Sequence, residues 1–228
     1  MIVFDSRSHT YKNETTGEEY ISATTLLNKF KKPFDRDGIA KRVADKEKVP
    51  VEDILAKWSK INSASKSQGT RIHGILEQYN KDKTFDNEHE QLILAYNQLN
   101  LFDEKDELLV EERVYNHNYK VAGTVDIIRN EARGGFSIFD IKTNKKFNFF
   151  SQYSESLLHP VKHLLNCEYS LYSLQLSLYA YMYQQLTGRR VNCLGIIYYD
   201  VPTNKFSYYT ANYLKTDIVN LLEYHAKN

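Results

Sequence analysis

Residues 119–142 read YKVAGTVDIIRNEARGGFSIFDIK, and this stretch decides the fold. It holds two runs rich in β-branched and aromatic residues, 119–128 and 136–142, separated by the turn-forming residues Asn130-Glu-Ala-Arg-Gly-Gly135. A third run of the same kind, 108–115, precedes them and is linked by Asn116-His-Asn. Such short links favour antiparallel neighbours, so the sequence predicts a three-stranded meander.

The rest of the chain predicts helices on both sides of this meander and a few more strands. Helices are expected from Ser22 to about Pro33, in two or three pieces between residues 37 and 60, over 67–81, 87–99 and 170–187, and from Thr216 onward. Strands are expected in a small hairpin over 9–21 and at 192–200 and 205–211. This order predicts an α/β (α+β) chain with a central mixed sheet flanked by helices and an N-terminal helical region.

Length and composition predict one domain. The 228 residues, 42% hydrophobic and 26% charged, suit a single folded unit with a mainly helical part over residues 1–105 and a sheet-bearing part over 106–228. The longest apolar run, 191–201, is too short to cross a bilayer, so we expect no membrane association. Two cysteines, Cys167 and Cys193, are too few for a four-cysteine zinc or iron–sulfur site. They indicate a reducing, cytoplasmic setting, which for a viral protein would be the host cytoplasm.

Charge is spread unevenly along a chain whose net charge is only +1. Residues 29–71 carry twelve Lys and Arg against six Asp and Glu, whereas residues 77–112 carry three against eleven. The basic segment could follow a phosphate backbone, and the acidic segment could hold a cation. Two ordinary solvated helical faces of opposite sign explain the same pattern equally well.

Two acids and a lysine in the meander form the main candidate site. Asp126 ends the motif Gly-Thr-Val-Asp on one strand, and the next strand contains Phe-Asp140-Ile-Lys142. Alternate residues of a strand face the same way, so Asp140 and Lys142 project together, and Asp126 can join them from the neighbouring strand. Two carboxylates can hold Mg²⁺ or Mn²⁺, and the amine can orient or deprotonate a water for phosphodiester hydrolysis. An Asp-x-Lys is often only a solvent-exposed alternation, but Asp140 ends an apolar strand, and a buried carboxylate needs a partner or a metal.

Two pairs of residues in predicted helices are weaker candidates. His73 and Glu77 lie one turn apart and can offer an imidazole and a carboxylate to a metal or to its water. Gln175 and Tyr179 also lie one turn apart, and an amide and a phenol there could contact phosphate oxygens or hold a catalytic group. Without further context, a helix-surface hydrogen bond explains the first pair and a core position explains the second.

Taken together, these motifs resemble a known family. The order G-T-x-x-H-x-x-L-E, G-T-V-D, D-I-K-T and Q-L-x-x-Y is similar to the RecB-like exonuclease branch of the PD-(D/E)xK nuclease superfamily. That branch includes phage and viral exonucleases and the mitochondrial genome-maintenance exonuclease. The likeness runs over residues 22–200, and it implies a restriction-endonuclease-like core. The helical region around Trp58 resembles the family segment that can form an arch over single-stranded DNA.

The resemblance also implies roles for individual residues. The metal ligands would be His73, Asp126, Asp140 and the Ile141 carbonyl. Lys142 would be the catalytic lysine, and Glu77 would act beside the metal or at a second metal. The residues that would contact nucleic acid are Gln175, Tyr179 and Arg71. The chain lacks the four cysteines of relatives with an iron–sulfur cluster, so we expect no such cluster. Residues 147–170 exceed what a minimal nuclease core needs, and they could form a substrate-binding loop or an oligomer contact.

We therefore expect a deoxyribonuclease that depends on Mg²⁺ or Mn²⁺. An exonuclease acting on DNA ends or single strands is favoured over an endonuclease, in phage or cellular recombination, replication or repair, with DNA and a recombination or replication protein as partners. The alternative is a catalytically silent nuclease fold that only binds DNA or protein, but its usual mark is the loss of an acid or of the lysine, and all are present here. A different metal-dependent hydrolase or a purely structural domain is a third interpretation.

Overall fold

Strand β5 (Val121–Asn130) organises the molecule because three other strands pair with it. The structure is a computed structural model that describes residues 2–5, 10–151 and 154–227. On one edge β5 pairs along its whole length with β4 (Glu107–Asn116). On the other edge it pairs with β3 (Glu19–Ser22) at its start and with β6 (Phe136–Lys142) at its end. The stretch of β5 between these two partners, residues 123–126, is called the fork below.

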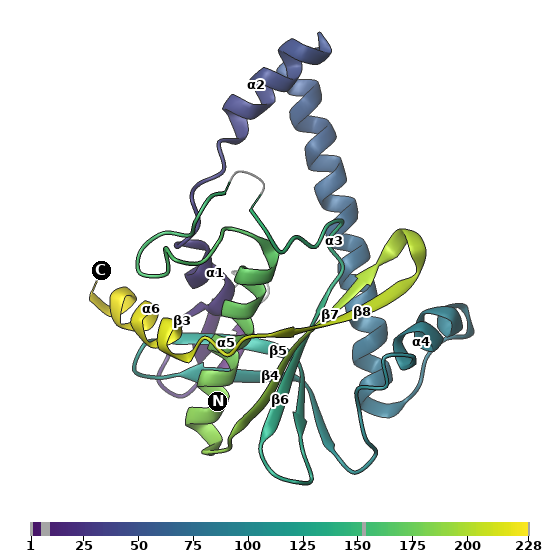
Figure 1. The fold of residues 1–228 in the computed structure, drawn as a ribbon, viewed down its shortest axis with the longest axis vertical. Helices are drawn as coiled ribbons and strands as arrows, with labels where there is room; N and C mark the ends of the chain where they lie inside the picture. Colours follow the sequence, from purple (N-terminus) through teal and green to yellow (C-terminus); the bar gives the residue numbers. More distant parts are fainter. Residues whose placement is uncertain (1, 6–9, 152–153, 228) are drawn as a thin grey trace.

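The remaining strands extend this unit into one mixed sheet (Figure 1). Its order is β1-β2-β3-β5-β6-β7-β8, with β4 paired to β5 beside this path. The outer strands are β1 (Ile2–Asp5), β2 (Thr10–Asn13), β7 (Val191–Asp200) and β8 (Lys205–Ala211). The β4–β5–β6 meander is antiparallel, as predicted, whereas β6 and β7 run parallel and therefore need a long crossover. The predicted α/β fold with a central mixed sheet flanked by helices is confirmed.

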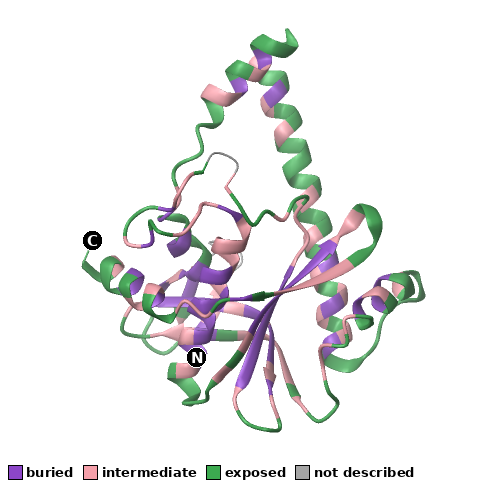
Figure 2. Ribbon diagram, viewed as in Figure 1, coloured by how far each residue is buried: buried purple, intermediate pink, exposed green. Residues whose placement is uncertain are grey.

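Helices cover both faces of the sheet, and alternate strand residues pack against different helices. Ile128 and Ile138 belong to a core shared with α5 (Glu168–Thr187), α6 (Lys215–Lys227) and α1 (Ala23–Asn28). Ile127 and Phe139, one position away, belong to a second core shared with α3 (Val51–Asp82) and α4 (Glu90–Asn97). Neighbouring strand residues point to opposite faces, so one sheet supports two cores. The central strands are accordingly the most buried part of the chain (Figure 2).

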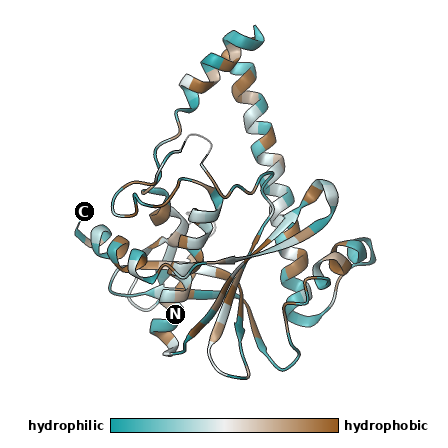
Figure 3. Cartoon of the chain, in the orientation of Figure 1, coloured by the Kyte–Doolittle hydropathy of each residue, from teal (hydrophilic) through white to brown (hydrophobic). Residues whose placement is uncertain are grey.

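Helices α2 (Arg36–Glu47) and α3 form a hairpin that projects from the body (Figure 1). Its outer end has a small core of Ala40, Ala44 and Ile54, and most of residues 56–71 are exposed around the helix, as Figure 2 shows. Apolar and polar residues alternate along the hairpin, without the continuous apolar stretch seen in the central strands (Figure 3).

The separation of residues 51–60 and 67–81 into different helices was wrong, because α3 is one helix of 32 residues. After Pro50 the stretch contains no proline, and its two glycines, Gly69 and Gly74, weaken a helix by only about 1 kcal/mol each. Both ends of α3 pack against other residues and are helical. The middle turns continue the helix between them, because extending an existing helix costs less free energy than starting a new one.

The N-terminal hairpin is confirmed over β2 and β3, although His9 lies outside the described residues. Strand β1, which pairs with β2, was not predicted. Helix α4 is preceded by a short 3₁₀ helix (Asn87–His89), and a second one (Val201–Thr203) joins β7 to β8. Most of residues 143–166 have no regular structure, and residues 152–153 of that segment lie outside the described part. Among the described helices, none is both long and apolar enough to cross a membrane.

Candidate active site

The two predicted acids of the meander meet at the fork. The last pair between β5 and β6 is Ile127 with Phe139, and the next position on each strand is an acid, Asp126 on β5 and Asp140 on β6. Beyond this point β6 leaves β5 and continues beside β7. The backbone N–H of Ile141 then donates to Oδ2 of Asp126 over 2.6 Å, which links the two strands where their ladder ends. Asp140 is only 4% exposed, so its carboxylate lies inside the protein.

Strand β4 adds a third acid, Glu111, that the sequence analysis did not single out. The register of β4 against β5 places Glu111 opposite Asp126, between the pairs Val110–Ile127 and Glu112–Val125. We call Glu111, Asp126 and Asp140 the carboxylate row, because they lie on three neighbouring strands. Like charges opposite each other destabilise a sheet, and a bound cation would offset the repulsion between these carboxylates.

The backbone at Glu111 is in an unusual conformation. Its φ is +56°, in the left-handed region that residues other than glycine rarely adopt within a strand. Such a conformation costs of the order of 1–3 kcal/mol, and it persists only where the surrounding structure imposes it. Strain of this kind is concentrated at functional sites, which is consistent with a working role for Glu111.

Helix α3 brings His73 to the carboxylate row. Nδ1 of His73 lies 3.6 Å from Oδ2 of Asp126. One ligand atom from each of His73, Glu111 and Asp126 lies within 4.8 Å of the others. Glu77, one turn further along α3, lines the same small cavity, and its carboxylate accepts a hydrogen bond from Lys81 over 2.5 Å. An imidazole and several carboxylates in this arrangement make a donor set that suits Mg²⁺ or Mn²⁺.

Burial controls the protonation of the row. It raises the pKa of Asp140 to about 6 and that of Glu111 to about 7, and the negative charge of Asp126 adds to both increases. Burial also acts to raise the pKa of Asp126, but the hydrogen bond and charge of His73, with help from Lys142, hold it below its usual value. Conversely, burial acts to lower the pKa of His73, and the contact with Asp126 raises it overall. Without a cation, protons therefore neutralise part of the negative charge of the row.

Lys142 and Gln175 complete the site from the other side. Nζ of Lys142 lies 2.6 Å from Oδ2 of Asp140 and donates to Oε1 of Gln175 over 3.2 Å. Nε2 of Gln175 donates to Oδ1 of Asp140 and to the hydroxyl of Tyr179, each over 3.1 Å. The amide thus fixes the positions of both charged groups, and the buried Tyr179 fixes the amide. The structure brings the predicted residues of β6 and α5 together.

An aromatic residue that the sequence analysis did not name supports Lys142. Nζ of Lys142 lies 4.6 Å from the centre of the Tyr172 ring, a cation–π distance. The Tyr172 hydroxyl donates to Oδ1 of Asn144 over 3.0 Å, so the ring is held from its far end as well. Tyr172 lies three residues before Gln175, and i, i+3 spacing on a helix could have revealed that the two share a face.

Arg71 lies apart from the other predicted residues, whereas Ile141 lies in the site. Arg71 lines open grooves of about 510 and 250 Å³ next to residues 84–92, where it does not share the small cavity of His73. Residues two apart on a helix differ by about 200° around its axis, so Arg71 and His73 point in nearly opposite directions. For Ile141 the structure shows the amide contact with Asp126. A metal contact by its carbonyl stays a prediction.

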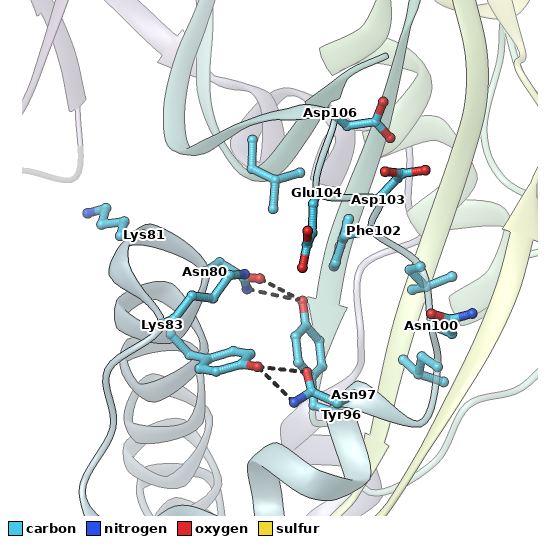
Figure 4. Close-up of a pocket in the computed structure, with 14 residues that line it drawn as sticks. Asn80, Lys81, Lys83, Tyr96, Asn97, Asn100, Phe102, Asp103, Glu104 and Asp106 are labelled. Carbon is cyan, nitrogen blue, oxygen red and sulfur yellow. Dashed lines mark hydrogen bonds between the residues drawn. The ribbon is translucent and has the colours of Figure 1, made fainter. Parts of the chain in front are cut away.

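A cavity of about 650 Å³ lies beside the carboxylate row, on the other side of Asn80, which also lines the small cavity of His73. Asn80 hydrogen-bonds to the hydroxyl of Tyr96 within it (Figure 4). Its charged lining consists of Lys81, Lys83, Asp103, Glu104 and Asp106, and it includes neither His73 nor Lys142 nor any member of the carboxylate row. The carboxylate row, rather than this larger cavity, is therefore the candidate reaction centre.

Gly123 allows Tyr179 to approach the fork closely, which leads to a testable expectation. A Cβ at position 123 would lie 2.4 Å from Cε1 of Tyr179. In Gly123→Ala we expect the ring to move and to shift Gln175, with a loss of stability of about 1–3 kcal/mol and a clear loss of catalytic rate. Thermal unfolding and cleavage assays measure the two effects.

Gly74→Ala is the matched control, because a Cβ there meets nothing within 4 Å. It should stabilise α3 by up to about 1 kcal/mol and leave the catalytic rate unchanged. Equal rates for the two variants would contradict the proposed link from Gly123 through Tyr179 to Gln175.

Comparisons with known proteins do not establish the function of this protein. Neither a protein-family model nor a curated protein matches this sequence. Two similar solved structures are the protein SSO0001, with 15% identity and a TM-score of 0.41, and a proposed exonuclease from Eubacterium rectale, with 11% identity and a TM-score of 0.42. The matches cover 91% and 92% of this chain and 74% and 78% of those chains. Both TM-scores are below 0.5, so the function proposed next rests on the geometry of the carboxylate row and its neighbours.

Proposed function

We propose that this protein is a metal-dependent deoxyribonuclease of the RecB-like branch of the PD-(D/E)xK nucleases. The observation that carries the proposal is the carboxylate row at the fork, with His73 on one side and Lys142 on the other. Two or more carboxylates, an imidazole and an amine around one point suit the hydrolysis of a phosphodiester. The order of the sequence motifs, described above, supports the same assignment.

The residues fit a divalent cation. His73, Glu111 and Asp126 present ligand atoms within 4.8 Å of one another, and the raised pKa values of Glu111 and Asp140 indicate negative charge that lacks full compensation. Asp140 and the Ile141 carbonyl would be further ligands. When bound, Mg²⁺ or Mn²⁺ lowers the pKa of a bound water and neutralises charge on the phosphate during cleavage.

The protein side chains then have distinct tasks. Lys142 lies against Asp140, where its ammonium can orient the attacking water or stabilise charge on the phosphate. Gln175 holds Lys142 and Asp140 in one geometry, and Tyr179 holds Gln175. Glu77 is near enough to Glu111 to raise its pKa, so it can assist at the same centre or bind a second cation.

DNA ends or single strands are the proposed substrates. The projecting hairpin of α2 and α3 belongs to the basic stretch over residues 29–71, and α3 runs from it directly to His73. A single strand guided along this hairpin would reach the carboxylate row without the need to open a duplex. Lysines along the hairpin would attract the phosphate backbone in a salt-dependent manner. This arrangement supports exonucleolytic action, and recombination, replication or repair is the setting that we propose for it.

A panel of substrates tests the proposal. End-labelled single-stranded DNA, end-labelled duplex and covalently closed circular DNA are each incubated with the protein in Mg²⁺ or Mn²⁺. We expect short products from the linear substrates and an intact circle. Cleavage of the circle would show endonucleolytic action, and intact DNA in every reaction would contradict nuclease activity.

The affinity for metal should increase with pH. Without a cation, the pKa values of Asp140 and Glu111 rise from 3.8 and 4.5 to about 6 and 7 on folding. Because the pKa of each group is higher in the folded state, the folded protein holds these protons more tightly than the unfolded chain does. The resulting stabilisation is fully present at pH values below the unfolded pKa, and it is lost as the pH rises through 6 to 7. A metal must displace the same protons, so it binds more tightly as they leave.

The expected result is a larger increase in melting temperature on addition of Mn²⁺ at pH 7.5 than at pH 5.5. Thermal unfolding at both pH values, with and without Mn²⁺, measures it. Equal shifts at the two pH values would show that the metal binds elsewhere.

A further inference from the structure

A groove between α1 and α5 starts at the reaction centre. It has a volume of about 250 Å³, and Gln175 forms part of its wall. The same Gln175 side chain contacts Asp140 and Lys142. We call this cavity the α1–α5 groove. A molecule held in it would extend directly from the place where a phosphate is cleaved.

Residues of α1, of the turn that follows it and of α5 form the walls. Thr24, Asn28 and Lys31 follow one another at i, i+4 and i+7 spacing, and they line one side. On the other side Tyr172 and Gln175 lie three residues apart on α5. Thr24 and Asn28 share one face of α1, and Tyr172 and Gln175 share one face of α5, whereas Lys31 lies three residues past the end of α1.

The lining has an apolar floor and a polar edge. Leu27, Leu171 and the Tyr172 ring supply carbon surface. Two further groups, the Asn28 amide and the Lys31 ammonium, supply hydrogen-bond donors, and Asn28 also offers an acceptor. The carboxylate of Glu168 is a second acceptor, and it already accepts from Asn148 over 2.9 Å.

These properties fit a nucleobase better than a phosphate. A base has two flat apolar faces and an edge that carries both donors and acceptors. An aromatic ring such as Tyr172 can stack on any base. A bare phosphate would be repelled by Glu168, whereas an exocyclic amino group would be attracted to it.

We propose that the α1–α5 groove binds the base of the nucleotide whose phosphate is cleaved. This proposal rests on the proposed nuclease function and adds a subsite to it. With the phosphate at the carboxylate row, the attached nucleoside extends past Gln175 into the groove. Tyr172, which contacts Lys142 and the ring of Phe147, would meet the base with the part of its side chain that lines the groove. Every base offers a flat face to the apolar floor, so the groove can accept any of them.

The test combines groove variants with abasic substrates. Asn28 is exposed and Lys31 is partly exposed, so Asn28→Ala/Lys31→Ala should fold, which melting temperature checks. Steady-state kinetics use a labelled oligonucleotide and a matched one that is abasic at the nucleotide to be released. For the wild-type protein we expect the abasic change to raise KM by about tenfold, the range of one stacked base, with little change in kcat.

The double variant should show a similar increase in KM with the intact oligonucleotide and little further increase with the abasic one. Lys32→Ala is the matched control, because Lys32 is next in the chain but lies 3.8 Å from Glu155 and does not line the groove. It should leave KM unchanged. If the double variant unfolds, Asn28→Trp, which fills the groove from an exposed position, replaces it and should give the same KM pattern.

The outcomes separate this proposal from the nuclease assignment. Normal cleavage by the wild-type protein with unchanged KM in the groove variant contradicts the subsite and leaves the nuclease function intact. Persistence of the abasic effect in the folded variant likewise contradicts the subsite, because the base would then be read elsewhere. No metal-dependent cleavage by the wild-type protein on any substrate contradicts both proposals.

Discussion

Asp140→Asn lowers the rate of Mg²⁺-dependent DNA cleavage by at least about a hundredfold, the usual consequence of losing one preorganised electrostatic contact. The substitution keeps the size of the side chain and an Oδ1 that can accept from Gln175, but it removes a negative charge from the carboxylate row. Metal affinity therefore falls as well. Single-turnover cleavage of a labelled oligonucleotide measures the rate.

DNA binding by Asp140→Asn should persist, because the variant lacks a negative charge near the substrate phosphate and keeps every basic residue. Fluorescence anisotropy of a labelled oligonucleotide checks this point, and thermal unfolding checks the fold. Wild-type cleavage rates in a folded Asp140→Asn protein would rule out the carboxylate row as the reaction centre.

Glu111→Gln has the second-largest expected effect, a loss of about tenfold or more in metal affinity together with a fall in cleavage rate. The substitution removes one of the three groups whose ligand atoms lie within 4.8 Å of one another. It also removes a carboxyl group whose pKa is raised to about 7, so the pH dependence of metal binding should become weaker. Calorimetric titration with Mn²⁺ at pH 5.5 and pH 7.5 measures both effects.

Glu112→Gln is the matched control for Glu111→Gln. Glu112 is the next residue of β4, but it neither lines the small cavity of His73 nor belongs to the three groups whose ligand atoms lie within 4.8 Å of one another. It should keep the metal affinity and the cleavage rate of the wild-type protein. Equal losses in both variants would mean that the effect comes from the charge of β4 in general and that Glu111 has no special place in the site.

The strand positions of Asp126, Asp140 and Lys142 could be predicted because each strand is apolar and the turn before Phe136 is rich in glycine. Local sequence sets such features directly. The same holds for the pairs on α3 and α5, whose spacing alone places His73 with Glu77 and Gln175 with Tyr179 on common faces.

Glu111 could not be predicted, because its place depends on the register of β4 against β5. A shift of one residue in that register would turn Glu111 to the other face, and a link such as Asn116-His-Asn leaves the shift open. The two adjacent acids in the run 108–115, Glu111 and Glu112, were the only local sign, and local sequence does not tell them apart. The left-handed backbone of Glu111, imposed by the surrounding sheet, has no sequence signature in a glutamate.

The length of α3 was also hidden from local reasoning. Residues 59–70 include several serines, an asparagine and Gly69, which are weak helix formers, so the sequence favoured a break. Packing of Ala40, Ala44 and Ile54 at the outer end and of Ile72 and Leu76 at the body holds the helix at both ends. Contacts distant in sequence thus decided the shape of the projecting hairpin.

Cleavage of end-labelled linear DNA by wild-type protein and by Asp140→Asn, purified in parallel and assayed with Mn²⁺ and with excess chelator, tests the central claim most directly. We predict that only the wild-type protein in Mn²⁺ degrades the DNA, and that chelator stops the reaction. Degradation by both proteins, or by the wild-type protein in chelator, would contradict a metal-dependent nuclease centred on Glu111, Asp126 and Asp140, as would intact DNA in all four reactions.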